Sequence, residues 1–151
     1  MRRIYTNHEL CTGCRACSMA CAISHFKIAD ESLGAIQILR NPLIGYEFQA
    51  VCRVCEEPEC VAACMAVALT KDPDSGQIKL DRDRCVGCWM CVSVCPHNAV
   101  VPNQREGKII LCDQCEGRDV PACYAACATK AIAYIEDEEV LDLLKKQAAV
   151  K

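Results

Sequence analysis

Sixteen cysteines in a chain of 151 residues constrain this fold more than any other feature. They fall into four groups of four, and no cysteine lies outside a group. The groups are, in chain order, Cys11, Cys14, Cys17 and Cys21; Cys52, Cys55, Cys60 and Cys64; Cys85, Cys88, Cys91 and Cys95; Cys112, Cys115, Cys123 and Cys127. Sulfur atoms so close along a chain make disulfides, bind single metal ions or bind metal clusters. The fold therefore depends on which of these three the cysteines make.

A disulfide scaffold is the first possibility, because cysteine exceeds the ~8–10% typical of short secreted scaffolds. Such a scaffold needs export, yet Cys11 follows MRRIYTNHEL before any apolar run that could serve as a signal sequence. The longest apolar stretch, VAACMAVAL at 61–69, is far shorter than the ~20 residues that span a bilayer. We therefore predict a cytoplasmic protein with no membrane span, in which neighbouring cysteines bind metal.

Charge and composition exclude other classes. The formal net charge is −3 and no dense run of Lys or Arg occurs, so we expect no nucleic-acid or anionic-membrane partner. Aromatic residues make up only 5% of the chain, and much of the hydrophobic 52% is cysteine, alanine and valine. An ordinary hydrophobic core would be thin.

A short signature repeats along the chain. CMAVAL, CPHNAV and CATKAI, which begin at Cys64, Cys95 and Cys127, all have an alanine four residues after the cysteine, followed by an aliphatic residue. This predicts a repeated unit of a ligand loop, a helical turn with the last cysteine, and a strand. Turn signals at 72–76, at 102–107 and at NPLIG predict three hairpins. The acids and lysines of 136–147 predict a terminal helix, lying on its own domain or docked on a partner.

The spacing within the groups separates single metal ions from clusters. A structural zinc usually joins two well-separated C-x2–4-C pairs. The first and third groups instead read C-x2-C-x2-C-x3-C, the run that holds [4Fe–4S] clusters in bacterial ferredoxins, and Pro96 completes it in the third. The second group reads C-x2-C-x4-C-x3-C and the fourth reads C-x2-C-x7-C-x3-C, so each has one longer spacer and the same x3 ending. Taken alone, either group could bind zinc. Gly13 and Gly87, just before the second cysteine, would let backbone N–H groups approach inorganic sulfide.

These residues resemble a known family, the four-cluster ferredoxin-like electron-transfer subunits of complex oxidoreductases. Its members include iron–sulfur subunits of dimethyl sulfoxide reductase, formate dehydrogenase, formate hydrogenlyase, carbon monoxide dehydrogenase and tungsten aldehyde oxidoreductase systems. The resemblance implies an α+β fold of two nested bacterial-ferredoxin-like modules over 1–135, with short strands and helical turns around four [4Fe–4S] clusters. The outer module would comprise 1–30 and 105–135, the inner module 50–104, and 136–151 would form the terminal helix or tail.

The resemblance also implies which cysteines share a cluster, because the fourth cysteine of each run in two-cluster ferredoxins ligates the other cluster. Carried over to the nested modules, this predicts four ligand sets. They are Cys11, Cys14, Cys17 and Cys127 (set 1); Cys112, Cys115, Cys123 and Cys21 (set 2); Cys52, Cys55, Cys60 and Cys95 (set 3); Cys85, Cys88, Cys91 and Cys64 (set 4).

Little remains for substrate chemistry once clusters use the cysteines. The histidines His8, His25 and His97 are scattered, and we assign them to turns or the surface; no phosphate-binding glycine motif occurs. We therefore predict a non-catalytic subunit that relays single electrons between a large catalytic subunit, by resemblance a molybdo- or tungstopterin enzyme, and a second redox partner or further copies of itself. The alternatives are a partner of carbon monoxide dehydrogenase or hydrogenase, a free polyferredoxin carrier, and a zinc-structured interaction module.

Overall fold

A computed structural model describes residues 2–136, 139 and 140, which form short helices and two-stranded antiparallel sheets. The strands are β1 (Arg2–Thr6), β2 (Gln37–Asn41), β3 (Tyr46–Ala50), β4 (Leu69–Lys71), β5 (Ile78–Leu80), β6 (Val101–Asn103), β7 (Lys108–Ile110) and β8 (Ile132–Glu136). The helices are α1 (Ala16–Phe26), α2 (Glu59–Ala62), α3 (Met90–Val94) and α4 (Ala122–Ala126), with 3-10 turns η1 (His8–Leu10) and η2 (Glu31–Leu33). This mixture of short elements agrees with the predicted α+β class.

The three predicted hairpins are confirmed. β2 pairs with β3, β4 with β5 and β6 with β7, each pair antiparallel. Turn chemistry explains the β4–β5 connection: the Asp72 carboxylate accepts hydrogen bonds from the backbone N–H groups of Asp74 and Ser75, at 3.0 Å each. Gly76 then takes a φ of +66°, a conformation that glycine adopts without strain.

The fourth sheet joins the two ends of the described chain. β1 pairs antiparallel with β8, from Arg2 opposite Glu136 to Thr6 opposite Ile132. Asn7 extends the contact by donating its backbone N–H to the carbonyl of Ala131 at 2.7 Å. The strand β8 was predicted by the repeat, whereas β1 was not. The pairing brings the first cysteine group close to the last.

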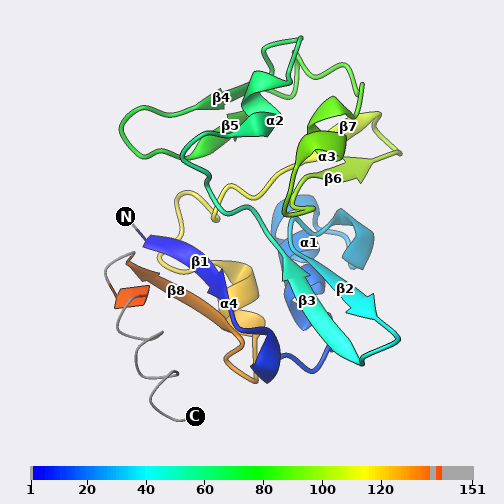
Figure 1. The fold of residues 1–151 in the computed structure, drawn as a ribbon, viewed down its shortest axis with the longest axis vertical. Coiled ribbons are helices and arrows are strands. Elements are labelled where there is room, and N and C mark those ends of the chain that lie inside the picture. The colour runs from blue at the N-terminus through cyan, green and yellow to red at the C-terminus, as the bar shows by residue number, and fades with distance from the viewer. Residues whose placement is uncertain (1, 137–138, 141–151) are drawn as a thin grey trace.

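The elements separate into two halves along the long axis of the molecule (Figure 1). One half contains β4 to β7 with α2 and α3, all from the middle of the chain, and α2 packs against α3. The other contains β1, β2, β3 and β8 with α1 and α4, and α1 packs against α4. The segment after β3 crosses from one half to the other (Figure 1).

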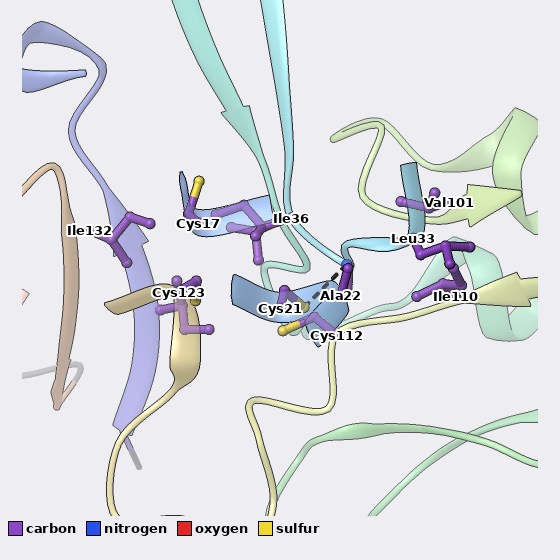
Figure 2. Packing of buried hydrophobic residues seen from close by; sticks show 13 residues of the cluster. Cys17, Cys21, Ala22, Leu33, Ile36, Val101, Ile110, Cys112, Cys123 and Ile132 are labelled. Atoms are coloured by element: carbon purple, nitrogen blue, oxygen red, sulfur yellow. Dashed lines mark hydrogen bonds between the residues drawn. The ribbon is translucent and has the colours of Figure 1, made fainter. Parts of the chain in front are cut away.

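Each half has its own hydrophobic core, and the β6–β7 hairpin contributes to both. Val101 and Ile110 pack in the larger core, while Val100 and Ile109 pack in the smaller. Neighbouring residues of extended chain point to opposite faces, so one hairpin serves two cores. Figure 2 shows Val101 and Ile110 beside Leu33 in the larger core.

Cysteine is a main component of the larger core. Cys17, Cys21, Cys112 and Cys123 are among its buried residues, together with small side chains such as Ala22. Figure 2 shows Cys17 near Ile36, Cys123 near Ile132, and Cys21 near Cys112. The apolar packing of this half is therefore built around thiols.

The predicted terminal helix over 136–147 lies largely outside the described residues. Glu136 is the last residue of strand β8, so no helix begins there; Glu139 and Val140 are helical.

Candidate metal centres

The ligand loops share one backbone feature. The residue before the second cysteine has a left-handed conformation in all four groups, with φ values of +68° at Gly13, +51° at Val54, +68° at Gly87 and +55° at Gln114. Residues that alternate between right- and left-handed conformations turn successive N–H groups to the same side and create an anion-binding concavity. The sequence indicated this feature only where glycine occupies the position.

A second left-handed residue explains the repeated C-x3-A signature. Val67, Asn98 and Lys130 lie three residues after the last cysteine of their groups and have φ values of +50°, +49° and +57°. The turn at Val67 aims the N–H of the next residue, Ala68, at Cys64 Sγ, at an N···S distance of 3.3 Å.

The same contact recurs in the other units that carry the signature. Ala99 donates its N–H to Cys95 Sγ at 3.4 Å, and Ala131 donates to Cys127. Each alanine is 2% exposed, so the site admits only a small side chain. In the first group α1 continues past Cys21, and the N–H of Ala35 reaches Cys21 Sγ instead, at 3.3 Å (Figure 2).

Two cavities are each lined by four cysteines. Cys11, Cys14, Cys17 and Cys127 line the first, with Ile38 and Ile132 beside them. Cys64, Cys85, Cys88 and Cys91 line the second, with Leu69 and Trp89. In both cavities, three cysteines come from one group and the fourth from another.

The remaining cysteines also lie in two neighbourhoods. Within each neighbourhood, the negative charge of one cysteine acts to raise the pKa of the others. Cys52 interacts with Cys55 and Cys95, and Cys60 interacts with Cys52, Cys55 and Cys95. Cys123 interacts with Cys21 and Cys115, and Cys112 interacts with Cys123 and Cys21.

Contacts between neighbourhoods define a spatial order. Cys123 also interacts with Cys17, and Cys112 also interacts with Cys52. Two cysteines are exposed, Cys14 and Cys88, and they line different cavities. In contrast, Cys21, Cys112, Cys115 and Cys123 are all buried.

Burial keeps several of these thiols protonated when no cation is near. It raises the pKa of Cys17 and of Cys60 to about 11 and that of Cys123 to about 12. Partial burial also acts to raise the pKa of Cys127, but the Thr129 hydroxyl and nearby backbone N–H groups hold it below its usual value. A bound cation must replace these protons, because thiolates are the ligands of metals.

The donor set fits a [4Fe–4S] cluster. Such a cluster takes four thiolates, and hydrogen bonds to sulfur adjust its potential. Here four thiols face each of two cavities, and backbone N–H groups already point at Sγ atoms, including Gln114 N to Cys112 at 3.4 Å and Ala122 N to Cys115 at 3.5 Å. A cluster would use the thiols as ligands and supply one-electron redox chemistry.

His25 is a residue of the site that sequence reasoning missed. It lies near the C-terminal end of α1, where Nε2 is 3.6 Å from Cys115 Sγ and 3.6 Å from Asp113 Oδ1. We assigned it to a turn or the surface because no motif surrounds it. The packing of α1 against the segment that bears Cys115 brings them together, and no local signal in the sequence could have shown this.

Gly87 provides a test of the loop geometry. A Cβ atom at this position would lie 2.0 Å from the carbonyl oxygen of Gly107, and φ is +68°. Replacing Gly87 with Ala should therefore destabilise the fold by about 1–2 kcal/mol from the backbone conformation, plus about 1–3 kcal/mol from the clash. Anaerobic chemical denaturation of the purified protein measures this loss.

The matched control is Gly76→Ala. Gly76 has a similar φ of +66°, but the nearest atom to its added Cβ is Lys71 Cε at 3.8 Å. Only the conformational cost applies, so this variant should lose about 1–2 kcal/mol. Equal losses in the two variants would show that the close approach to Gly107 has no energetic weight.

Comparisons with known proteins agree with this chemistry. Residues 45–137 match the family model of the 4Fe-4S dicluster domain. The electron transport protein HydN of Escherichia coli (strain K12) is 30% identical over 94% of this chain and 92% of its own length. Subunit beta of the NADH-dependent phenylglyoxylate dehydrogenase of Aromatoleum evansii is 37% identical over 83% of this chain, which spans 28% of that subunit.

A solved structure has the same fold. A chain of the BamBC active site complex of benzoyl coenzyme A reductase, in complex with benzoyl-CoA, aligns with a TM-score of 0.54 at 18% sequence identity. The alignment covers 98% of this chain and 89% of that chain. Within the part of the chain that the structure describes, no helix has the length and apolar character needed to cross a membrane.

Proposed function

Because the chain belongs to the 4Fe-4S dicluster domain family, we propose that it is the non-catalytic electron-transfer subunit of an oxidoreductase complex and carries four [4Fe–4S] clusters. The observation that carries the proposal is the gathering of sixteen thiols into four neighbourhoods of four. A cluster with four thiolate ligands accepts and gives up one electron at a time. The chain would therefore relay electrons rather than transform a substrate.

We propose sets 1 to 4 as the ligands of the four clusters. The cavity with Cys127 supports set 1, and the cavity with Cys64 supports set 4. The electrostatic neighbours of Cys123 support set 2, and those of Cys60 support set 3. In each set the fourth cysteine comes from another group, as in two-cluster ferredoxins.

The same pairing supports two nested modules. Sets 1 and 2 combine the first and last cysteine groups, whose helices α1 and α4 pack together and whose strands β1 and β8 pair. Sets 3 and 4 combine the two central groups, whose helices α2 and α3 pack together. The central module would thus be inserted into a module made by the two ends.

The spatial order supports a linear relay through sets 1, 2, 3 and 4. Cys17 of set 1 neighbours Cys123 of set 2, and Cys112 of set 2 neighbours Cys52 of set 3. Sets 3 and 4 border the same core. The exposed cysteines Cys14 and Cys88 belong to sets 1 and 4, so electrons would enter and leave at opposite ends.

The partner at one end would be a large catalytic subunit. The resemblance noted in the sequence favours a molybdo- or tungstopterin enzyme, with carbon monoxide dehydrogenase or hydrogenase next. The named relatives support an oxidoreductase complex in general. The second partner would be another redox protein or a further copy of this chain, in a reducing cytoplasm that keeps the cysteines free of disulfides.

Purification under anaerobic conditions tests the subunit proposal. We expect the native protein to elute with a much larger subunit, because a relay needs an electron donor and acceptor held close to its ends. Elution of the chain alone, in a brown and redox-active form, would favour a free polyferredoxin carrier. A colourless preparation that contains only zinc would contradict the cluster proposal and favour the zinc-structured interaction module.

Cross-linking of the isolated complex tests whether the relay runs from end to end. Peptides around Cys14 and peptides around Cys88 should link to different partners, because these exposed cysteines mark opposite ends of the proposed chain of clusters. If all cross-links to partners map to one of these two surfaces, the end-to-end relay is wrong.

A further inference from the structure

Two arginines each directly follow a cysteine of a ligand loop but have different surroundings. Arg15 directly follows Cys14, and Arg53 directly follows Cys52. The Arg15 side chain is half exposed, and its Nη1 lies 2.6 Å from Glu31 Oε1, so a carboxylate balances its charge. Arg53 is partly buried, and its Nη2 donates to the neutral hydroxyl of Thr6 at 2.9 Å. Within residues 2–136, 139 and 140, Arg53 forms no ion pair with an Asp or Glu.

A partly buried guanidinium without a carboxylate is unfavourable unless another negative charge is near. Burial lowers the pKa of Arg53, whereas the neighbouring Tyr5 and Cys52 act to raise it. Arg53 stays protonated in any case, because arginine does not lose its proton in proteins. Cys52 is the group on which the proposed function places negative charge.

Arg53 also lies at the crossing between the two halves. Its neighbour Cys52, of set 3, interacts with Cys112, of set 2. Arg53 donates to Thr6 at the end of β1, and Arg3 of β1 donates to the carbonyl of Val54 at 3.4 Å. The side chain is therefore held beside the point where set 2 meets set 3.

We propose that Arg53 is the counter-ion of the cluster held by Cys52 and raises the reduction potential of that cluster. This inference rests on the proposed function. A cluster with four thiolates carries a charge of about −2 when oxidised and gains one further negative charge on reduction. A fixed positive charge nearby stabilises the reduced form more than the oxidised form.

The step that Arg53 assists balances without a proton. One electron leaves the cluster of set 2, which is oxidised, and enters the cluster of set 3, which is reduced. The guanidinium remains charged throughout, so its effect is electrostatic. Arg53 would favour the passage of electrons from the outer module, which holds set 2, into the inner module, which holds set 3.

The competing explanation is structural: Arg53 could serve only to tie the segment 52–54 to β1. Charge and hydrogen bonding must therefore be changed separately. Arg53→Gln removes the charge and keeps a donor for Thr6, while Arg53→Lys keeps the charge. Arg15→Gln is the control, because Arg15 also directly follows a loop cysteine but is paired with Glu31.

Anaerobic redox titration of the holoprotein, followed by electron paramagnetic resonance, provides the readout. Arg53→Gln should weaken electron binding by one cluster at least tenfold, which lowers its one-electron potential by at least about 59 mV. The affected cluster should be the one whose signal changes in Cys52→Ser. Arg53→Lys should keep most of the native potential, and Arg15→Gln should leave the potential of the cluster held by Cys52 unchanged.

A second pair of variants keeps the test decisive if Arg53→Gln does not assemble. Thr6→Asp would place a carboxylate against the guanidinium and should lower the same potential, whereas Thr6→Asn should not. Unchanged potentials in Arg53→Gln or Thr6→Asp, or an equal shift in Arg15→Gln of the potential of the cluster held by Cys52, would overturn the role of Arg53. A wild-type protein without iron–sulfur signals would instead overturn the proposed function itself.

Discussion

Replacement of Cys127 with Ser should disrupt the cluster that we propose for Cys11, Cys14 and Cys17, more than one hundred residues away in the sequence. Cys127 lines the same cavity as these three cysteines, and Cys17 interacts electrostatically with both Cys11 and Cys127. A serine hydroxyl is a harder and more weakly acidic ligand than a thiol, so this cluster should be lost or lose one iron. Iron analysis and Mössbauer spectroscopy of the anaerobically purified variant measure the loss.

The reciprocal variant is Cys21→Ser. Cys21 belongs to the first group, but Cys123 and Cys115 are its neighbours. This variant should damage the cluster of Cys112, Cys115 and Cys123 and leave that of set 1 intact. If Cys127→Ser instead alters the cluster of its own group, and Cys21→Ser that of the first group, ligation is local and the proposed sets 1 and 2 are wrong.

Features of the fold that depend on local signals could be predicted from the sequence. The three hairpins follow from turn residues such as Asp72 and Gly76, whose hydrogen bonds and φ angles act within a few residues. The repeated alanine marked the strand that follows each unit. Both kinds of signal report on the backbone nearby, so they remain valid without knowledge of tertiary contacts.

Features that depend on long-range contacts or unusual backbone angles could not be predicted in this way. The strand β1 forms because β8 supplies its partner, and its own five residues carry no distinct signal. Val54 and Gln114 adopt left-handed angles that their residue types disfavour, because the ligand loop requires them there. His25 reaches Cys115 only through the packing of α1.

The candidate site shows the same division. Cysteine spacing identified every proposed ligand, since each group of four begins with C-x2-C and ends with C-x3-C, as in the runs that hold [4Fe–4S] clusters. It could not identify Arg53 as a site residue, because Arg15 also directly follows a loop cysteine and has a different environment. The two arginines differ in that Arg15 pairs with the Glu31 carboxylate, whereas Arg53 donates to the neutral Thr6 hydroxyl, and this difference is a property of the folded chain.

Removal of iron and sulfide should unfold most of this protein. Four of the buried residues of the larger core are proposed ligands, and the smaller core has only Leu69, Ile78, Val100 and Ile109 besides Cys91 as buried members. A core this small cannot offset the conformational entropy of the chain, so cluster binding would supply much of the folding free energy. Circular dichroism before and after anaerobic chelation should show loss of most secondary structure.

Reconstitution with iron and sulfide provides the control for this experiment. The spectrum should return when clusters reform, whereas zinc, which binds one ion per four thiolates and brings no sulfide, should restore it only in part. Burial raises the pKa of thiols such as Cys123 to about 12, so the protein without clusters holds neutral thiols in place of bound thiolates. Neutral thiols do not bridge the cysteine groups, and they accept hydrogen bonds from the N–H groups of Ala68 and Ala99 less strongly than thiolates do. The ligand loops should therefore lose their left-handed turns first. A chelated protein that keeps its native spectrum and thermal transition would show that the two apolar cores suffice, and that the clusters contribute redox chemistry but not folding free energy.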